Sequence, residues 1–306
     1  MNQTEAQHET ETATSPVPAA LGETRIGPTT FAWGTRTFVM GIVNVTPDSF
    51  SGDGLLGPGM PDTSGAPAAS VSPVEKAVAL ARTMADEGAD LLDVGGESTR
   101  PGHTEVDANE EIRRVVPVVA AIRVALPSMA ISIDTTKPAV AAAAIDAGAD
   151  LVNDVWGVGE DDALVRLAAE RRVPIVLMHN RAEPRYRDLM AEVADDLERA
   201  IERARRVGVA WTDILVDPGF GFGKTAEHNL ELLRELGSLR RLGRPILLGA
   251  SRKSTLGKVL DLPADERLEA TIATTVLGIG GGADIVRVHD VRANVRAARM
   301  TDAVLR

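Results

Sequence analysis

The fold is decided by the stretch Val39-Met40-Gly41-Ile42-Val43-Asn44-Val45-Thr46-Pro47-Asp48-Ser49-Phe50. It begins as an apolar run of strand length and ends in the amide of Asn44 and a Pro-Asp turn. A buried strand that ends at a polar side chain and opens into a loop is how a barrel enzyme presents its chemistry. The stretch alone is equally consistent with a core strand and an ordinary turn, so the rest of the chain decides between the two.

The same order of strand, polar residue, loop and helix recurs seven more times. Strands are predicted over residues 38–44, 89–94, 130–134, 149–153, 173–178, 213–217, 244–248 and 283–288. Gly-Ala-Asp precedes a strand at Gly88, Gly148 and Gly282, where glycine ends the preceding helix. Eight such units predict an α/β fold of one domain, a closed (β/α)8 or TIM barrel. A doubly wound open sheet is the alternative, but no G-x-G-x-x-G follows the first strand.

The barrel is expected to span residues 31–306, with two segments outside its regular pattern. Residues 1–30 are rich in Thr, Glu, Ala and Pro, which predicts a disordered tail. Residues 31–37 are expected to form a small hairpin that closes the barrel floor. Residues 57–71 interrupt the first loop with many Gly, Pro and Ser and are interpreted as a flexible insertion.

Composition excludes several classes of function. The net charge of −11 argues against a nucleic-acid partner, which usually needs a basic face. The chain has no cysteine, so it has no thiol nucleophile and no Cys-zinc site. No apolar run reaches the roughly 18 residues of a membrane span, and the acidic N-terminus does not resemble a signal peptide. A cytoplasmic protein with no membrane partner is therefore expected.

Hydrogen-bonding side chains stand at the carboxyl ends of the predicted strands, where barrel active sites lie. Any one of them alone is more readily explained as a loop residue or a helix cap, but the set together predicts a site. Its members are Asn44, Glu97, Asp134, Asn153, His179, Asp217, Lys253, Arg287 and His289.

The chemistry of this set favours a flat heterocycle next to an anion. Carboxylates and an amide at Asp134, Asn153 and Asp217 can accept hydrogen bonds from ring N–H groups, and Lys253 can donate to a ring carbonyl or nitrogen. Arg100, Arg287 and His289, with the start of the last helix, could hold a phosphate or pyrophosphate. Asn44 offers a hard oxygen ligand to Mg²⁺.

Several other motifs receive structural interpretations. Lys137 and Arg252 are expected to be solvated or ion-paired, and Asp154 and Asp161 to act as caps. The glycines of residues 219–223 do not have the spacing of a phosphate-binding P-loop, so we expect a tight turn that exposes Phe222.

The motifs in this order resemble those of the dihydropteroate synthase family over residues 36–306. They are Met-Gly-Ile-Val-Asn-Val-Thr-Pro-Asp-Ser-Phe-Ser at 40–51, Gly-Gly-Glu-Ser-Thr-Arg-Pro-Gly at 95–102, Ile-Asp-Thr at 133–135, Asn-Asp-Val at 153–155, Met-His at 178–179, Asp-Pro-Gly-Phe-Gly-Phe-Gly-Lys at 217–224, Ser-Arg-Lys-Ser at 251–254 and Arg-Val-His-Asp-Val at 287–291. The resemblance implies a pterin-binding TIM barrel that joins 6-hydroxymethyl-7,8-dihydropterin pyrophosphate to p-aminobenzoate. The products would be 7,8-dihydropteroate and pyrophosphate, in folate synthesis.

The same resemblance implies a role for each matching residue. The pterin ring would be bound by Asp134, Asn153, Asp217 and Lys253, and the pyrophosphate by Thr99, Arg100, Arg287 and His289. Asn44 would hold Mg²⁺. The p-aminobenzoate pocket, where sulfonamides compete, would be formed by Phe50, Pro101, Phe222 and Ser254. The groups closest to the reaction would be Asp134, Lys253, Arg287 and His289. A homodimer joined through the last helices is also implied.

Two other functions remain open at this point. A folate-dependent methyltransferase would share the pterin-binding wall, but it has no need for Arg287 with His289 or for the Thr-Pro-Asp-Ser-Phe loop. A non-catalytic pterin-binding paralogue would keep all the binding residues. The sequence also departs from the family at residues 51–54, which read Ser-Gly-Asp-Gly where Ser-Asp-Gly-Gly is more common.

Overall fold

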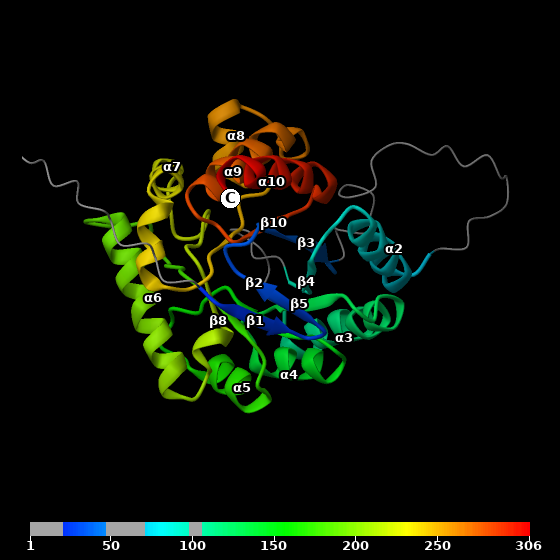
Figure 1. Cartoon of the computed structure of the whole chain (residues 1–306). Coiled ribbons are helices and arrows are strands. Elements are labelled where there is room, and N and C mark those ends of the chain that lie inside the picture. Colours follow the sequence, from blue (N-terminus) through cyan, green and yellow to red (C-terminus); the bar gives the residue numbers. More distant parts are fainter. Residues whose placement is uncertain (1–20, 47–70, 98–105) are drawn as a thin grey trace, which may run out of the picture.

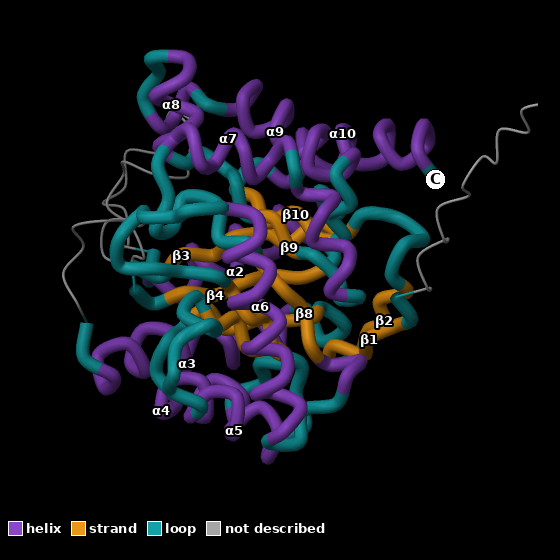
Figure 2. The backbone as a smooth tube through the Cα atoms, turned by 90° about the vertical axis from the view of Figure 1, so that its left-hand side faces the viewer, coloured by secondary structure: helices purple, strands orange, loops and turns teal. Residues whose placement is uncertain are grey.

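Eight parallel strands form a closed barrel in the computed structural model, which describes residues 21–46, 71–97 and 106–306. Around the barrel the strands follow the order β8-β7-β6-β5-β4-β3-β10-β9, and a bridge between Val216 and Ile246 joins the two ends of this order. The strands are β3 (Phe38–Asn44), β4 (Leu91–Gly95), β5 (Ala130–Asp134), β6 (Leu151–Asp154), β7 (Ile175–Met178), β8 (Ile214–Asp217), β9 (Leu247–Leu248) and β10 (Ile285–Val288). Figure 2 shows them in the centre of the molecule with helices around them. The predicted (β/α)8 barrel is therefore confirmed.

Helices follow the strands in the expected alternation. They are α2 (Pro73–Asp86), α3 (Ala108–Ala125), α4 (Pro138–Asp146), α5 (Ala163–Arg171), α6 (Leu189–Arg206), α7 (Ala226–Arg234), α8 (Ser254–Leu260), α9 (Leu268–Gly280) and α10 (Val291–Leu305), with short 3-10 turns at Trp211–Asp213, Leu236–Leu242 and Ala264–Glu266. The predicted cap at Ser72 forms a capping box with Glu75. Gly88, Gly148 and Gly282 adopt the positive φ expected of helix-ending glycines. Within the described residues, no helix combines the length and the apolarity that a membrane span requires.

A hairpin lies at the amino-terminal end of the barrel, earlier in the chain than predicted. Strand β1 (Glu23–Ile26) pairs antiparallel with β2 (Thr29–Ala32) across a Gly-Pro turn. The prediction of a disordered tail through residue 30 is therefore wrong from Glu23 onward, and the floor hairpin lies at 23–32 rather than 31–37. Averaging composition over the thirty residues hid the buried side chains of Thr24 and Ile26. Residues 1–20 and most of the predicted insertion at 57–71 lie outside the described part of the chain.

Side chains that point into the barrel change from apolar to polar along β4, β5, β6, β8 and β10. Near the hairpin they are apolar and pack with Ile26, Phe31 and Trp33 in one buried cluster, whose strand members are Phe38, Met40, Leu91, Ala130, Leu151, Val176, Leu215, Leu247 and Ile285. Alternate residues of a strand share a face, so the next inward positions are Asp93, Ser132, Asn153, Asp217 and Arg287. The interior thus has an apolar floor and a polar mouth. Figure 1 shows β1 and β2 lying across the floor end.

Candidate active site

The strand register brings the predicted residues to one end of the barrel. Asn44 is paired with Gly95, Gly95 with Asp134, and Asp134 with Asn153, so one row crosses four neighbouring strands. Asp217 ends β8 and Arg287 lies on β10. Phe50, Thr99, Arg100 and Pro101, which were also predicted for the site, lie outside the described residues.

Arg287 holds two carboxylates at the centre of the mouth. Its Nε donates to Asp93 Oδ2 at 2.5 Å, and its Nη2 donates to Asp134 Oδ2 at 2.7 Å. Asn153 Nδ2 also donates to Asp93 Oδ2, at 3.1 Å. Arg287 was predicted only as a pyrophosphate ligand, whereas here it also fixes the acidic wall.

Asp93 was missed by the sequence reasoning. It stands in the middle of a strand whose neighbours are apolar, and its side chain is fully buried. A charged residue inside an otherwise apolar strand was the available signal, because burying an unpaired carboxylate is costly. It lies two residues before the strand ends, and the search for polar residues stopped at the strand tips.

Several buried acceptors at the mouth have no hydrogen-bond partner among the described residues. They are Asp93 Oδ1, Ser132 Oγ, Asp134 Oδ1 and Asn153 Oδ1. Buried polar atoms in native proteins are nearly always paired, so such a group needs an explanation. Four acceptors from three adjacent strands suit a planar ligand that presents several N–H donors.

Asp217 and Lys253 form the opposite side of the mouth. Asp217 Oδ1 accepts a hydrogen bond from the Gly219 amide at 2.7 Å. Lys253 Nζ donates to the Phe220 carbonyl and lies 4.2 Å from the centre of the Phe222 ring. The loop after β8 therefore contacts both groups.

Burial shifts the protonation equilibria of these groups towards neutrality. It raises the pKa of Asp134 to about 7, although the Arg287 cation opposes the shift. It also raises the pKa of Asp217, with Lys253 opposing. It lowers the pKa of Lys253 to about 7 against the attraction of Asp217. Burial acts to lower the pKa of Arg287 too, but Asp93 and Asp134 raise it above its ordinary value, so the cation is retained.

The remaining predicted cations, His289 and Arg252, lie in the loops that follow β10 and β9. His289 Nδ1 lies 2.9 Å from the Ser251 hydroxyl, and the His289 amide donates to the same oxygen. Arg252 pairs with Asp290 at 2.6 Å, which confirms its expected ion pair. Ser254 is exposed at the first turn of α8, a helix that the sequence did not predict. Gly257 within this short helix lowers its propensity.

Other polar residues prove structural, as expected. Lys137 is ion-paired with Glu97 and Glu111. The expected helix caps are wrong: Asp154 accepts from the Trp156 amide in a turn after β6, and Asp161 accepts from the Ala163 amide one residue before Asp162, the N-cap of α5.

The loop after β8 is the predicted tight turn. Gly219, Gly221 and Gly223 have φ of 70°, 85° and 54°, which favours glycine. Phe222 is half-buried rather than exposed, because one face of its ring lies against Lys253.

His179 and Asn44 differ in what surrounds them. His179 is fully buried and contacts Asp196 and Lys224 instead of the barrel axis. Asn44 is half-buried at the end of β3, and its side chain has no hydrogen-bond partner within the described residues. No group of three His, Cys, Asp or Glu side chains in that part of the chain is placed to hold a metal.

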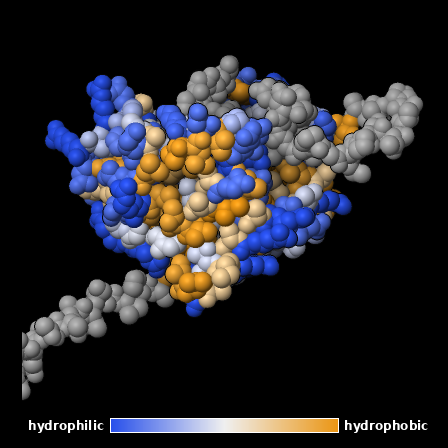
Figure 3. Space-filling model, turned by 90° about the horizontal axis from the view of Figure 1, so that it is seen from above, coloured by the Kyte–Doolittle hydropathy of each residue, from blue (hydrophilic) through white to orange (hydrophobic). Residues whose placement is uncertain are grey.

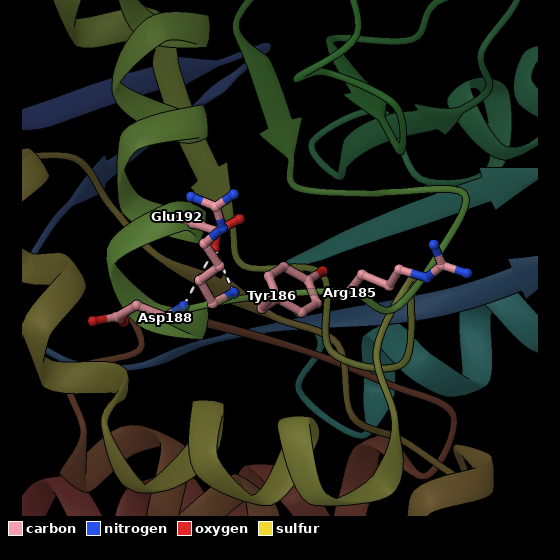
Figure 4. A pocket seen from close by; sticks show the side chains of 5 residues that line it. Arg185, Tyr186, Asp188 and Glu192 are labelled. Carbon is pink, nitrogen blue, oxygen red and sulfur yellow. Dashed lines mark hydrogen bonds between the residues drawn. The ribbon is translucent and has the colours of Figure 1, made fainter.

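An open cavity of about 590 Å³ lies on the loop before α6. Arg185, Tyr186, Arg187, Asp188 and Glu192 line it, and Glu192 accepts from the amides of Arg187 and Asp188 (Figure 4). None of the predicted site residues lines this cavity, so we assign the site to the barrel mouth.

The fold is that of a barrel enzyme, and the unpaired acceptors at its mouth suit a flat ligand with several N–H donors. Residues 40–289 match the family described as pterin binding enzyme. A dihydropteroate synthase of Clostridium beijerinckii is 48% identical over 283 residues, covering 92% of this chain and 99% of the relative.

Solved structures give the same result. The dihydropteroate synthase of Clostridium difficile, crystallised in the presence of pteroic acid, has a TM-score of 0.82 at 48% identity, covering 90% of this chain and 99% of that one. The Xanthomonas albilineans dihydropteroate synthase with 4-aminobenzoic acid has a TM-score of 0.82 at 40% identity, covering 92% and 98%. The chain therefore belongs to the pterin-binding enzyme family and, within it, to the dihydropteroate synthases, a class of transferases.

Proposed function

We propose that the chain condenses 6-hydroxymethyl-7,8-dihydropterin pyrophosphate with p-aminobenzoate, forming 7,8-dihydropteroate and pyrophosphate in folate synthesis. The observation that carries the proposal is the set of unpaired buried acceptors at Asp93, Ser132, Asp134 and Asn153. A pterin ring presents N–H groups along one edge, and these acceptors offer it partners. The similarity to a structure with bound 4-aminobenzoic acid supports the second substrate.

The acidic wall would orient the pterin. Asp134 and Asn153 lie in register on β5 and β6, and Asp217 approaches from β8. Lys253 would donate to a ring carbonyl or nitrogen from the opposite side. Because Arg287 fixes two of the wall's carboxylates, their oxygens are held in position before the ligand arrives.

Bond cleavage would separate charge between the pterin methylene and pyrophosphate. The carboxylate of Asp134 would stabilise positive charge that spreads into the ring. Arg287 and His289, with Thr99 and Arg100, would hold the departing anion. The amine of p-aminobenzoate would form the C–N bond to the methylene as the C–O bond breaks, and would release one proton to the departing pyrophosphate or to water. An aniline nitrogen is nucleophilic without a strong base, so the mouth requires no Ser-His-Asp or Cys-His arrangement.

A Mg²⁺ ion is proposed beside this anion. Asn44, at the end of β3, would supply one hard oxygen, and the ion would complete its shell with water and pyrophosphate oxygens. Bound there, Mg²⁺ would neutralise charge on the leaving group.

The p-aminobenzoate would lie against Phe222 and Ser254, with Phe50 and Pro101 completing the pocket, and sulfonamides would compete there. Phe222 is already half-buried beside Lys253, so this wall lies next to the pterin end. A cytoplasmic location is also proposed, in line with the bacterial synthases to which the chain is similar.

The test is dihydropteroate formation by purified protein supplied with both substrates and Mg²⁺. We expect product and pyrophosphate in equal amounts, and no product without p-aminobenzoate. Asp217→Ala should raise the KM for the pterin substrate about tenfold, since a buried acceptor is lost. Asp213→Ala, four residues earlier in the 3-10 turn before β8, is the matched control. A wild-type chain that binds pterin but forms no product would instead be a non-catalytic paralogue.

A homodimer is also proposed, with α9 and α10 as its interface. These helices expose Leu277, Met300, Val304 and Leu305, each more than half accessible, and the upper face of the molecule carries a hydrophobic patch (Figure 3). Such patches mark interaction sites. Leu277→Glu with Met300→Glu should yield monomers in sedimentation analysis, whereas Val124→Glu on α3 should not. A wild-type monomer at micromolar concentration would contradict the proposal.

A further inference from the structure

A second polar cluster lies behind the mouth, outside the set of substrate ligands proposed above. It joins the end of β7, helix α6 and the loop after β8 through His179, Asp196 and Lys224. His179 Nε2 lies 3.2 Å from Asp196 Oδ2, and His179 Nδ1 lies 2.9 Å from Lys224 Nζ. Arg181 fixes Asp196 in turn, at 2.8 Å.

Lys224 is fully occupied by protein acceptors. Its ammonium lies 3.1 Å from the Gly219 carbonyl, 3.0 Å from the Phe222 carbonyl and 2.9 Å from His179 Nδ1. Burial lowers the pKa of Lys224 to about 7, although Asp217 opposes the shift. In its ammonium form the residue has three N–H donors, and these three acceptors saturate them. Lys224 therefore has no free donor for substrate. Its two carbonyl partners lie in the loop after β8, which indicates that Lys224 holds this loop.

The geometry also fixes the form of His179. Nδ1 faces a donor and must accept, so the ring proton is on Nε2 and points to Asp196. Burial lowers the pKa of His179 to about 3, so the imidazole is neutral in this role. Asp196 on α6 therefore orients the His179 ring, and the His179 ring orients the Lys224 ammonium.

The loop that Lys224 holds contacts both halves of the proposed site. Its Gly219 amide donates to Asp217, its Phe220 carbonyl accepts from Lys253, and its Phe222 ring lies under the same lysine. Three left-handed glycines make this segment conformationally free in isolation. Hydrogen bonds from outside the segment are therefore needed to hold it in one conformation. Tyr186, at the cavity of Figure 4, adds another at 2.8 Å to the Gly223 carbonyl.

We propose that Lys224, oriented by His179 and Asp196, is a positioning residue that fixes residues 218–223 so that Asp217 and Phe222 face the pterin and the p-aminobenzoate. This inference rests on the proposed function for the identity of the two substrates. The fixing of the loop is a property of the free protein and can be measured without them.

The experiment compares Lys224→Met, which keeps length but has no donor, with Lys258→Met on exposed α8 as a matched control. We expect Lys224→Met to raise the KM for p-aminobenzoate about tenfold and to lower kcat less, because charged hydrogen bonds to two loop carbonyls are lost. In a Phe222→Ala background the same substitution should raise KM less than about twofold, because both changes act through one contact. Lys224→Gln, which retains two N–H donors, should have an intermediate effect and covers the case in which Lys224→Met does not fold.

Hydrogen exchange of the Gly219 and Gly221 amides in the ligand-free protein gives an independent measurement. Exchange should become faster in Lys224→Met and stay unchanged in Lys258→Met. Unchanged exchange, unchanged KM values with only a lower melting temperature, or full additivity with Phe222→Ala would overturn the inference. Absence of turnover in the wild type would instead reject the proposed function, while the exchange result would still decide whether Lys224 fixes the loop.

Discussion

The floor and the mouth of the barrel are built by the same strands but solve opposite problems. At the floor, Met40, Leu91, Leu215 and Ile285 pack against the hairpin with no polar atom to satisfy. Two residues further along three of these strands, Asp93, Asp217 and Arg287 replace them. One strand therefore carries a close-packed end and a charged end, separated by about 7 Å of backbone.

The difference between floor and mouth shows that the mouth is less stable in the free protein than a fully packed layer would be. A filled apolar layer has every contact it can make. The mouth instead contains buried acceptors without partners among the described residues, each of which destabilises the free protein. Such acceptors contribute to function only if a ligand donates hydrogen bonds to them. The floor should therefore respond to substitution through stability, and the mouth through binding.

Arg287→Met should have the largest effect, because it removes the only cation that contacts both Asp93 and Asp134 in the described structure. Two buried carboxylates would lose their partner, a loss of about 3–5 kcal/mol in unfolding free energy when one member of a buried pair is removed. We expect kcat/KM for the pterin substrate to fall by about 10³ or more, since a preorganised cation at the leaving group is lost as well. Denaturant unfolding and steady-state kinetics measure the two effects.

Arg292→Met on α10 provides the comparison for that substitution. Its guanidinium is mostly exposed and pairs with Glu87, so both quantities should stay close to wild type. If Arg287→Met were as harmless as this surface change, the two carboxylates would not depend on Arg287.

Leu215→Ala tests the floor. Leu215 is fully buried in the apolar layer, and truncation leaves a cavity that costs about 2–5 kcal/mol. The KM values of the folded enzyme should be unchanged, because Asp217 lies two residues further along the same strand, in the polar layer at the mouth. A raised pterin KM at temperatures where the variant is folded would show that the two layers are coupled.

Sequence reasoning predicted the barrel well because its signals are local. Ser72 before Pro73, and the glycines at 88, 148 and 282, define helix ends through backbone chemistry that does not depend on distant contacts. Polar residues at strand tips could be found for the same reason, since the parallel arrangement alone brings them together.

What escaped prediction depends on partners distant in sequence. Asp93 looks anomalous in its own strand and becomes intelligible only beside Arg287, 194 residues away. His179 follows a strand end like the other predicted site residues, yet its side chain contacts Lys224 and Asp196 behind the loop after β8. The hairpin at 23–32 is ordered by the barrel floor that it covers, which composition cannot reveal.

The protonation of Asp134 gives a smaller, continuous test of the mouth. Burial raises its pKa to about 7, so below that pH the carboxylate gains a proton, becomes a weaker acceptor for the pterin edge and no longer offers negative charge to the positive charge that spreads into the ring. The kcat/KM for the pterin substrate should fall about tenfold per pH unit on this acid side. Asp134→Asn should be much less active and should not show this limb, and the pH profile of both proteins decides the point. A wild-type profile that is flat from pH 5 to 8 would contradict the assignment.

Ser132→Ala should have the smallest effect and separates binding from stability most directly. The Ser132 hydroxyl is fully buried, and its oxygen has no partner among the described residues. Removing it therefore relieves an unsatisfied group, so the free protein should keep its stability or gain up to about 1 kcal/mol. The pterin substrate should bind a few-fold more weakly, and its stabilising effect in a thermal unfolding assay should shrink. Ser128→Ala, before the same strand at the floor end, should change neither. If Ser132→Ala instead destabilised the free protein, the hydroxyl would have a partner within the fold, and the mouth would be less dependent on its ligand than the floor comparison implies.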